Sequence, residues 1–311
     1  MNTQSNAVPG SPLGPRTTGT QVMTPAIIPE GRQLHWLVRR ELWENRSLYI
    51  APLAVAGLTL IGFVIATLGR AMATRNLALR WAVLEEPYTF AALLIMATTS
   101  LVAAIYCLDA LHGERRDRSI LFWKSLPVSD VNTVLSKAMI PIVVLPLLTF
   151  GITIAMQTIM LLLGSTAMLA SGMSPSALWT RLSWSQISLL LYHLVTVHGL
   201  YYAPIYAWLL LVSSWARRAP FLWAGLPLLA IGVVEKIAFN TTHFATMLGA
   251  RISGAGDAVG YPMTNSAEMH HELTLAAMST FLISPGMWIG LAVTAAFLTA
   301  AARVRRSQGP I

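Results

Sequence analysis

The apolar residues of this chain fall into long continuous runs, and most charged residues stand between those runs. A bilayer core about 30 Å thick is crossed by roughly 20 residues of helix, which advances about 1.5 Å per residue. Six runs reach that length, so the pattern predicts an all-α membrane protein with six transmembrane helices. The predicted spans are residues 48–68, 88–111, 138–163, 187–213, 220–239 and 280–302.

The segments outside these runs differ from them in composition. Residues 1–29 are rich in Pro, Gly, Ser, Thr and Asn, which favours a disordered tail, and they lack the apolar run of a signal peptide. Residues 112–137 form a charged loop between the second and third spans, and residues 303–311 form a short C-terminal tail. One transmembrane domain is therefore expected over residues 48–302.

Residues 30–47 combine apolar and basic positions at helical spacing. Leu37 belongs to one apolar face, whereas Trp36 and Trp43 fall on another face together with Arg39. Trp and Arg are favoured at membrane interfaces, so the segment is predicted to be an amphipathic interfacial helix. An ordinary helical extension of the first span explains the same pattern equally well.

The composition supports a membrane location. Charged residues make up 11% of the chain and hydrophobic residues 55%, whereas soluble domains carry about 25% charged residues. The net charge of +8 comes from basic residues that flank the apolar runs, which does not favour nucleic-acid binding. The only cysteine, Cys107, lies within an apolar run, so neither an intrachain disulfide nor a cysteine metal site is expected.

The distribution of Lys and Arg predicts the orientation. The termini and the two loops on their side of the membrane carry 15 basic residues, and the opposite side carries 5. Cytoplasmic loops carry the excess of Lys and Arg, so both termini are expected in the cytoplasm. The charged loop 112–137 then faces the cytoplasm as well.

That loop contains "RDRSILFWKSL", which lacks Gly and Pro and predicts a short helix. Pro127 would end this helix, and Ser129 or Asp130 would cap the next one. Helical spacing places Ile120, Phe122, Trp123 and Leu126 on one side, which leaves Leu121 among charged residues on the other side. A plain solvated loop is the alternative; a partner's groove would suit an exposed Leu ringed by charge.

The loop sequence "GERRDRSILFWKSLPVSD", followed by "SK", resembles the corresponding loop in permease subunits of ABC-2 type transporters. The resemblance is good over residues 32–165, where "RRELWENRSLYIAPL" also looks like the N-terminal region of one bacterial branch, and it extends to the rest by topology. The residues that match the family pattern in the loop are Glu114, Arg115, Leu126, Pro127, Val128, Ser129 and Lys137.

The resemblance implies a function for the whole chain. It would be the membrane-spanning subunit of an ATP-driven exporter in the bacterial inner membrane, in contact with membrane lipids, two cytoplasmic ATPase subunits and a second permease chain, identical or different. The chain has no Walker-type phosphate loop, so ATP and Mg would be bound by the ATPase, and no catalytic, cofactor or metal site is expected here.

In the family the short loop helix is the coupling helix, which contacts the ATPase. The residues assigned to that contact are Glu114, Arg115, Arg118, Leu121, Lys124 and Pro127.

Polar residues inside the predicted spans are candidates for a translocation path or an outer gate. Glu235 and Lys236 lie about 16 residues into the fifth span, roughly 24 Å along it, which places them near the outer interface. Glu235 is the candidate gate residue of this pair. The remaining candidates are Thr98, Thr99 and Ser100 in the second span and His198, Tyr201 and Tyr202 in the fourth.

Other functional classes have weaker support. A stand-alone secondary transporter is favoured only by Pro141 and Pro146, which interrupt the third span, because no internal repeat is evident. The "GAGD" sequence at 254–257 resembles an intramembrane protease motif, but Asp257 lies in an external loop. His193 and His198 are five residues apart, which is a poor spacing for a shared metal. Lipid, drug, polysaccharide and peptide substrates all fit so apolar a chain.

Overall fold

The computed structural model describes residues 30–73, 77–125, 128–170, 174–179, 191, 193–252 and 282–309. These residues are almost entirely helical, and no strand occurs among them. The predicted tail 1–29, Pro127 and the "GAGD" sequence lie outside the described residues.

Six helices within the described part of the chain are long and apolar enough to cross a membrane, which confirms the predicted number. The chain is therefore a multi-pass membrane protein. The six are α2 (Ser47–Ala73), α3 (Leu77–Asp109), α6 (Asp130–Met139) continued by η1 (Ile140–Val144) and α7 (Leu145–Ala170), η2 (Leu194–Tyr201) continued by α10 (Ala203–Trp215), α11 (Pro220–Phe239) and α14 (Pro285–Ser307).

The shorter helices are α1 (Glu30–Glu44), α4 (His112–Arg116), α5 (Ile120–Ser125), α8 (Ser176–Trp179) and α12 (His243–Ile252). The predicted loop 112–137 is shorter than expected, because the third membrane helix already begins at Asp130. Ser129 caps that helix and accepts a hydrogen bond of 3.1 Å from the Asn132 amide, which confirms the predicted cap.

The predicted short helix is also interrupted. The backbone of Arg118 is left-handed, with φ 58°, so α4 ends before it and α5 begins after it. The loop therefore contains two short helices joined by a tight turn.

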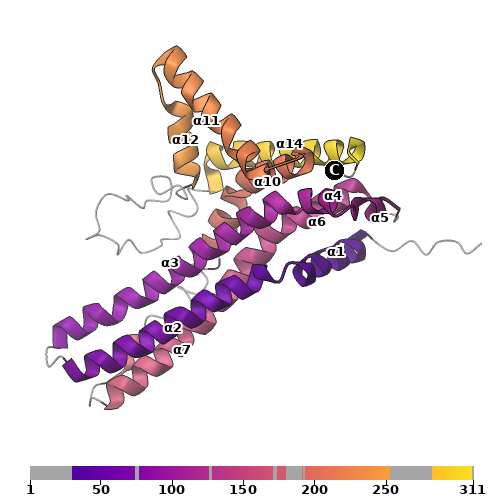
Figure 1. Cartoon of the computed structure of the whole chain (residues 1–311). Helices are drawn as coiled ribbons and strands as arrows, with labels where there is room; N and C mark the ends of the chain where they lie inside the picture. The colour runs from indigo at the N-terminus through magenta and orange to yellow at the C-terminus, as the bar shows by residue number, and fades with distance from the viewer. Residues whose placement is uncertain are drawn as a thin grey trace, which may run out of the picture.

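Figure 1 shows how the long helices are grouped. Helices α2, α3 and α7 lie side by side, and all three pairs of them are in contact. Helix α10 packs against both α3 and α14, and α11 with α12 forms a hairpin that extends away from the rest (Figure 1). Helices α1, α4, α5 and α6 gather at one end, beside the C-terminal end of α14. We call this region the loop end.

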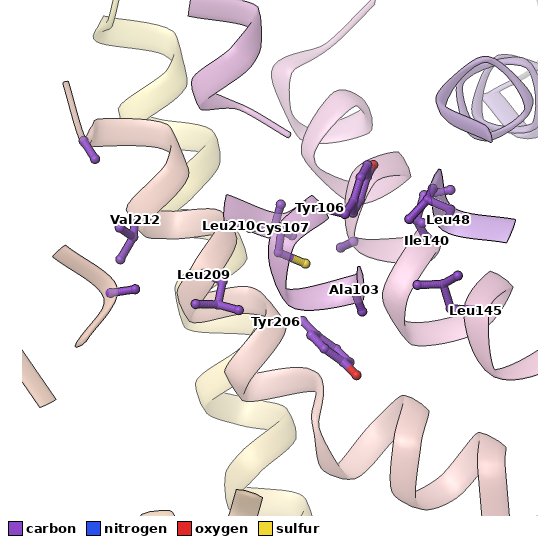
Figure 2. Packing of buried hydrophobic residues seen from close by; sticks show 13 residues of the cluster. Leu48, Ala103, Tyr106, Cys107, Ile140, Leu145, Tyr206, Leu209, Leu210 and Val212 are labelled. Carbon is purple, nitrogen blue, oxygen red and sulfur yellow. The ribbon is translucent and has the colours of Figure 1, made fainter. Parts of the chain in front are cut away.

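The largest hydrophobic cluster joins α3, η1 and α10 near the loop end (Figure 2). Tyr106 and Cys107 enter it from α3, Ile140 from η1, and Leu210 from α10. Cys107 is a free thiol with no solvent exposure. Side chains of α1, among them Val38, pack against the same cluster. The loop end is thus anchored to the largest hydrophobic cluster.

Two π-helical segments, η1 and η2, contact each other inside the core. Proline lacks an N–H, so Pro146 gives the Ile142 carbonyl no helical donor. That carbonyl faces Gly199 so closely that a Cβ at position 199 would lie 2.5 Å from its oxygen. Glycine at 199 therefore permits the close approach of the two segments.

The rest of the chain covers little of the surface of helix α11. Of its residues, Ala224 alone is buried, and large apolar side chains such as Ile237 and Phe239 are exposed. Such a helix is stable in lipid or against another protein surface, because its apolar side chains find no cover within the chain.

Candidate functional site

A group of buried charged side chains lies at the loop end. Lys137 of α6 places its Nζ 2.8 Å from Oε1 of Glu41 on α1 and 3.1 Å from Oε1 of Glu114 on α4. Glu41 is four residues after Leu37, so it shares the inward apolar face of α1 and packs toward α6. One ammonium group thereby joins three helices.

Arg305 extends the group to the last membrane helix. Its Nη2 donates to Oε2 of Glu114 at 2.9 Å, and its Nη1 pairs with the Asp130 carboxylate at the start of α6. The Tyr106 hydroxyl of α3 donates to Glu41 Oε2 at 2.9 Å. We call Glu41, Glu114, Asp130, Lys137 and Arg305 the ion cluster.

Four members of the ion cluster are buried. Exposed fractions are 3% for Glu41, 8% for Glu114, 2% for Lys137 and 4% for Arg305. Taking such charges out of water is costly, and only paired partners and hydrogen bonds compensate. Removing one partner therefore typically costs about 3–5 kcal/mol, so the cluster holds its helices in one mutual arrangement.

Helix α4 is fixed further by Arg115, which was predicted to contact a partner. Its Nη1 donates to the Ser214 carbonyl at 2.9 Å, and its Nη2 donates to Gln308 Oε1 at 3.1 Å. Beside it, the His112 amide donates to Ser213 Oγ at 2.9 Å. Arg115 and Glu114 are both buried and contact the chain's own residues, so neither offers its side chain at the surface.

Helix α5 presents the exposed part of the loop. Ile120 is buried, whereas Leu121 is 58% and Phe122 59% exposed. Lys124 of α5 and Arg118 of the preceding turn are also exposed, with Lys124 Nζ 2.7 Å from the Gln308 carbonyl. We call Arg118, Leu121, Phe122 and Lys124 the α5 surface.

Helix α5 also contacts α1 directly. The Arg40 guanidinium lies 3.5 Å from the ring centroid of Trp123, and its Nε pairs with Glu44 at 2.8 Å. Arg40 Nη2 approaches Glu41 at 3.3 Å, which brings it to the edge of the ion cluster. Trp123 is therefore held on α1, whereas Phe122, which was predicted to lie on the same side of the helix, is exposed beside Leu121.

A second polar site lies deeper, between α3, α7 and η2. Thr149 Oγ1 donates to Thr99 Oγ1 at 3.1 Å, and Ser100 Oγ lies 3.5 Å from His198 Nδ1. These side chains and Tyr206 line a cavity with room for about one water molecule. The structure thus brings together Thr99, Ser100 and His198, three of the predicted path residues.

The other predicted path residues are placed differently. Thr98 bonds the Leu94 carbonyl of its own helix at 2.7 Å. The Tyr202 ring stands 5.3 Å from that of His198, and its hydroxyl donates to the Ile252 carbonyl at 3.1 Å. The Tyr201 ring is 4.2 Å from the Arg251 guanidinium. Tyr201 and Tyr202 therefore connect the polar site to α12.

Glu235 lies away from this site, on the projecting hairpin. Its carboxylate accepts hydrogen bonds from the His243 amide at 2.7 Å, the Phe244 amide at 2.9 Å and the Thr241 hydroxyl at 2.8 Å. It caps the first turn of α12 from the neighbouring helix. A gating role for Glu235 stays a prediction.

The sequence gives no prediction for Glu41 or Arg305, and for Asp130 it predicts only a candidate helix cap. The position of Glu41 on the apolar face of α1 could have indicated a buried ion pair, because a charge buried there needs a partner. Arg305 stands between Arg303 and Arg306, which are both exposed, so its sequence context does not distinguish it.

Comparison of the chain with protein-family models, curated proteins and solved structures finds no match.

Proposed function

We propose that the chain is the membrane-spanning permease subunit of an ATP-driven exporter of the ABC-2 type. It would couple ATP hydrolysis by a separate cytoplasmic ATPase to movement of a substrate across the bacterial inner membrane. The sequence resemblance in the loop supports the family, and the six membrane-length helices fit it. In this proposal α1 is the amphipathic interfacial helix and α5 the coupling helix.

The observation that carries the proposal is the position of Glu114. It follows the last residue of α3 by five positions and precedes α5 by six, and it pairs with Lys137 of α6 and Arg305 of α14. A force on α5 is therefore transmitted to two membrane helices through buried ion pairs. A loop that was only solvated would keep its charged side chains in water, because burying them costs free energy.

The α5 surface is suited to a partner. Leu121 and Phe122 offer apolar area, while Arg118 and Lys124 offer positive charge for carboxylates of the ATPase. Rim charges steer association, and apolar anchors supply most of the binding free energy. Glu114 and Arg115 act behind this surface and hold α4 in place.

The charges at the loop end support the proposed orientation. Exposed arginines gather there, at Arg116, Arg118, Arg217, Arg218, Arg303 and Arg306. An excess of basic residues marks the cytoplasmic side, which fits contact with a cytoplasmic ATPase.

Two ATPase subunits and two permease chains form the proposed assembly. Symmetric dimers are the commonest oligomers, and the apolar surface of α11 is available for a second chain or for lipid. The polar site of Thr99, Ser100 and His198 is the proposed part of the translocation path within one chain.

The decisive experiment measures ATPase activity that co-purifies with the tagged full-length chain from its native membrane. We expect the wild type to retain it, and the Leu121→Asp variant and the double variant Arg118→Glu with Lys124→Glu to lose most of it. Arg303→Glu is the matched control, because this exposed arginine lies at the loop end outside the α5 surface. Equal recovery with the double variant would refute the α5 contact.

Absence of ATPase activity from the wild-type preparation would favour a stand-alone secondary transporter instead. The interrupted third membrane helix, with its π-helical segment, is the feature that fits that class.

A labelling experiment tests the orientation. A cysteine placed by Ser253→Cys in a Cys107→Ala background should react with an impermeant thiol reagent in intact cells. Labelling only after lysis would reverse the assignment of sides.

A further inference from the structure

The outward face of α1 carries alternating arginine and tryptophan residues. These residues are spaced four, three and four positions apart, which places them within an arc of about 60° around the helix axis. They are Arg32, Trp36, Arg39 and Trp43. All four are exposed, with Trp36 at 57% and Trp43 at 69%. We call these residues the Arg-Trp stripe.

The guanidinium of Arg39 lies between the two indoles. Its Cζ is 5.5 Å from the Trp36 ring centroid and 5.9 Å from that of Trp43. Of the ion pairs found within the described residues, none involves Arg39 or Arg32, whereas the adjacent Arg40 pairs with Glu41 and Glu44. The positive charge of the stripe is thus not neutralised by these carboxylates.

The stripe is held outward and close to the membrane surface. The opposite face of α1 carries Leu37 and Glu41, which are both buried, so the helix cannot turn over without exposing them. The first membrane helix begins at Ser47, four residues after Trp43. Trp43 and Arg39 therefore lie near headgroup depth, where indole and guanidinium groups are favoured.

We infer that the Arg-Trp stripe is a binding site for the headgroup phosphate of anionic phospholipids. The two arginines supply charge-assisted hydrogen bonds to phosphate, and a guanidinium can donate to it bidentately. Their positive charge also favours a headgroup of net negative charge over phosphatidylcholine, whose choline ammonium balances its phosphate. The two indoles flank Arg39 and contact the upper acyl chain. An acidic protein partner could pair with the arginines. The boundary between headgroups and acyl chains suits the indoles better, because they are apolar and more than half exposed.

This inference goes beyond the proposed function, because lipid binding requires no ATPase. It also goes beyond an interfacial location, since it selects the charge of the headgroup. The site lies on the same helix as Arg40 and Glu41, whose side chains contact Trp123 and Lys137.

The test uses the purified full-length chain in detergent and native mass spectrometry. Phosphatidylglycerol and phosphatidylcholine with identical acyl chains are titrated separately, and the apparent Kd of each is measured. One basic residue near an anionic surface contributes roughly a fivefold change in affinity, so two should give a preference for phosphatidylglycerol of about thirtyfold.

Arg32→Gln with Arg39→Gln should abolish this preference. Arg303→Gln should retain it, because Arg303 is an exposed arginine on α14 without a tryptophan neighbour in its turn. Trp36→Ala with Trp43→Ala should weaken binding of both lipids. Glycerol phosphate at the same concentration should not displace phosphatidylglycerol, since it lacks the acyl chain.

Equal affinity of the wild type for the two lipids would overturn the inference. So would an unchanged preference in the double arginine variant, an equal loss in Arg303→Gln, or displacement by glycerol phosphate. Slow reaction of the Cys107 thiol in every variant verifies that the fold is intact, because this thiol is fully buried.

Discussion

Replacing Lys137 by methionine removes the central cation of the ion cluster. Methionine keeps an unbranched apolar side chain of similar length, so packing changes little. Glu41 and Glu114 then remain buried beside each other without the ammonium that lies 2.8 Å and 3.1 Å from them. Breaking a buried pair in this way costs about 3–5 kcal/mol of the free energy of unfolding.

The single cysteine provides the assay. Cys107 is free and has no solvent exposure, so a thiol reagent reaches it only when the core opens. When reclosing is faster than labelling, the labelling rate follows the population of the open form. A loss of about 3–5 kcal/mol therefore predicts labelling faster by roughly a hundredfold to several thousandfold.

The matched control is Lys236→Met, which changes an exposed lysine on α11 and should leave the rate unchanged. Adding Glu41→Gln to Lys137→Met removes one of the two carboxylates that lost the ammonium. The glutamine oxygen can still accept the hydrogen bond of the Tyr106 hydroxyl. The double variant should then label more slowly than Lys137→Met alone. Labelling of Lys137→Met at the wild-type rate would refute the assignment of stability to the ion cluster.

Two further variants test features away from the cluster. Gly199→Ala should destabilise the chain by about 1–3 kcal/mol, measured as faster Cys107 labelling, because its Cβ would meet the Ile142 carbonyl at 2.5 Å; Gly225→Ala, with nothing within 4 Å, is the control. Glu235→Leu should lower hydrogen-exchange protection of α12 by about tenfold, since it removes the acceptor for the His243 and Phe244 amides, and unchanged protection would contradict the cap.

The membrane helices were predictable because their signal is local. Each span is a continuous apolar run, and a run of that length has few alternatives to a transmembrane helix. The Ser129 cap was predictable for the same reason, as a capping residue acts within three positions of itself.

The ion cluster was not predictable, because its pairs join residues far apart in sequence. Lys137 and Glu41 are separated by 96 positions, and Arg305 and Glu114 by 191. The composition of either segment fits a solvated positive loop equally well. The packing of α1 and α14 against α6, with Glu114 of α4 paired to Lys137, decides which charges are buried.

The division of the loop into α4 and α5 has a different cause. The segment "RRDRS" lacks Gly, Pro and Asn, the residues that mark a left-handed turn most clearly, and a left-handed backbone is uncommon for arginine. Burial of Glu114 on one side and Ile120 on the other fixes the direction of the chain at both ends of the turn. Tertiary contacts therefore override the local preference at Arg118.

The π-helical segment η1 also determines where the third membrane helix tolerates the deletion of a residue. A wide turn of this kind holds one residue more than a regular α-helical turn. Deleting one residue within 140–144 would shorten this turn to α-helical length and leave Lys137 and Thr149 on the faces they now occupy. The same deletion at Gly151 would rotate the remainder of α7 by about 100° and turn Met156 out of its cluster. Single-residue deletions along this helix are thus tolerated best where it is already irregular.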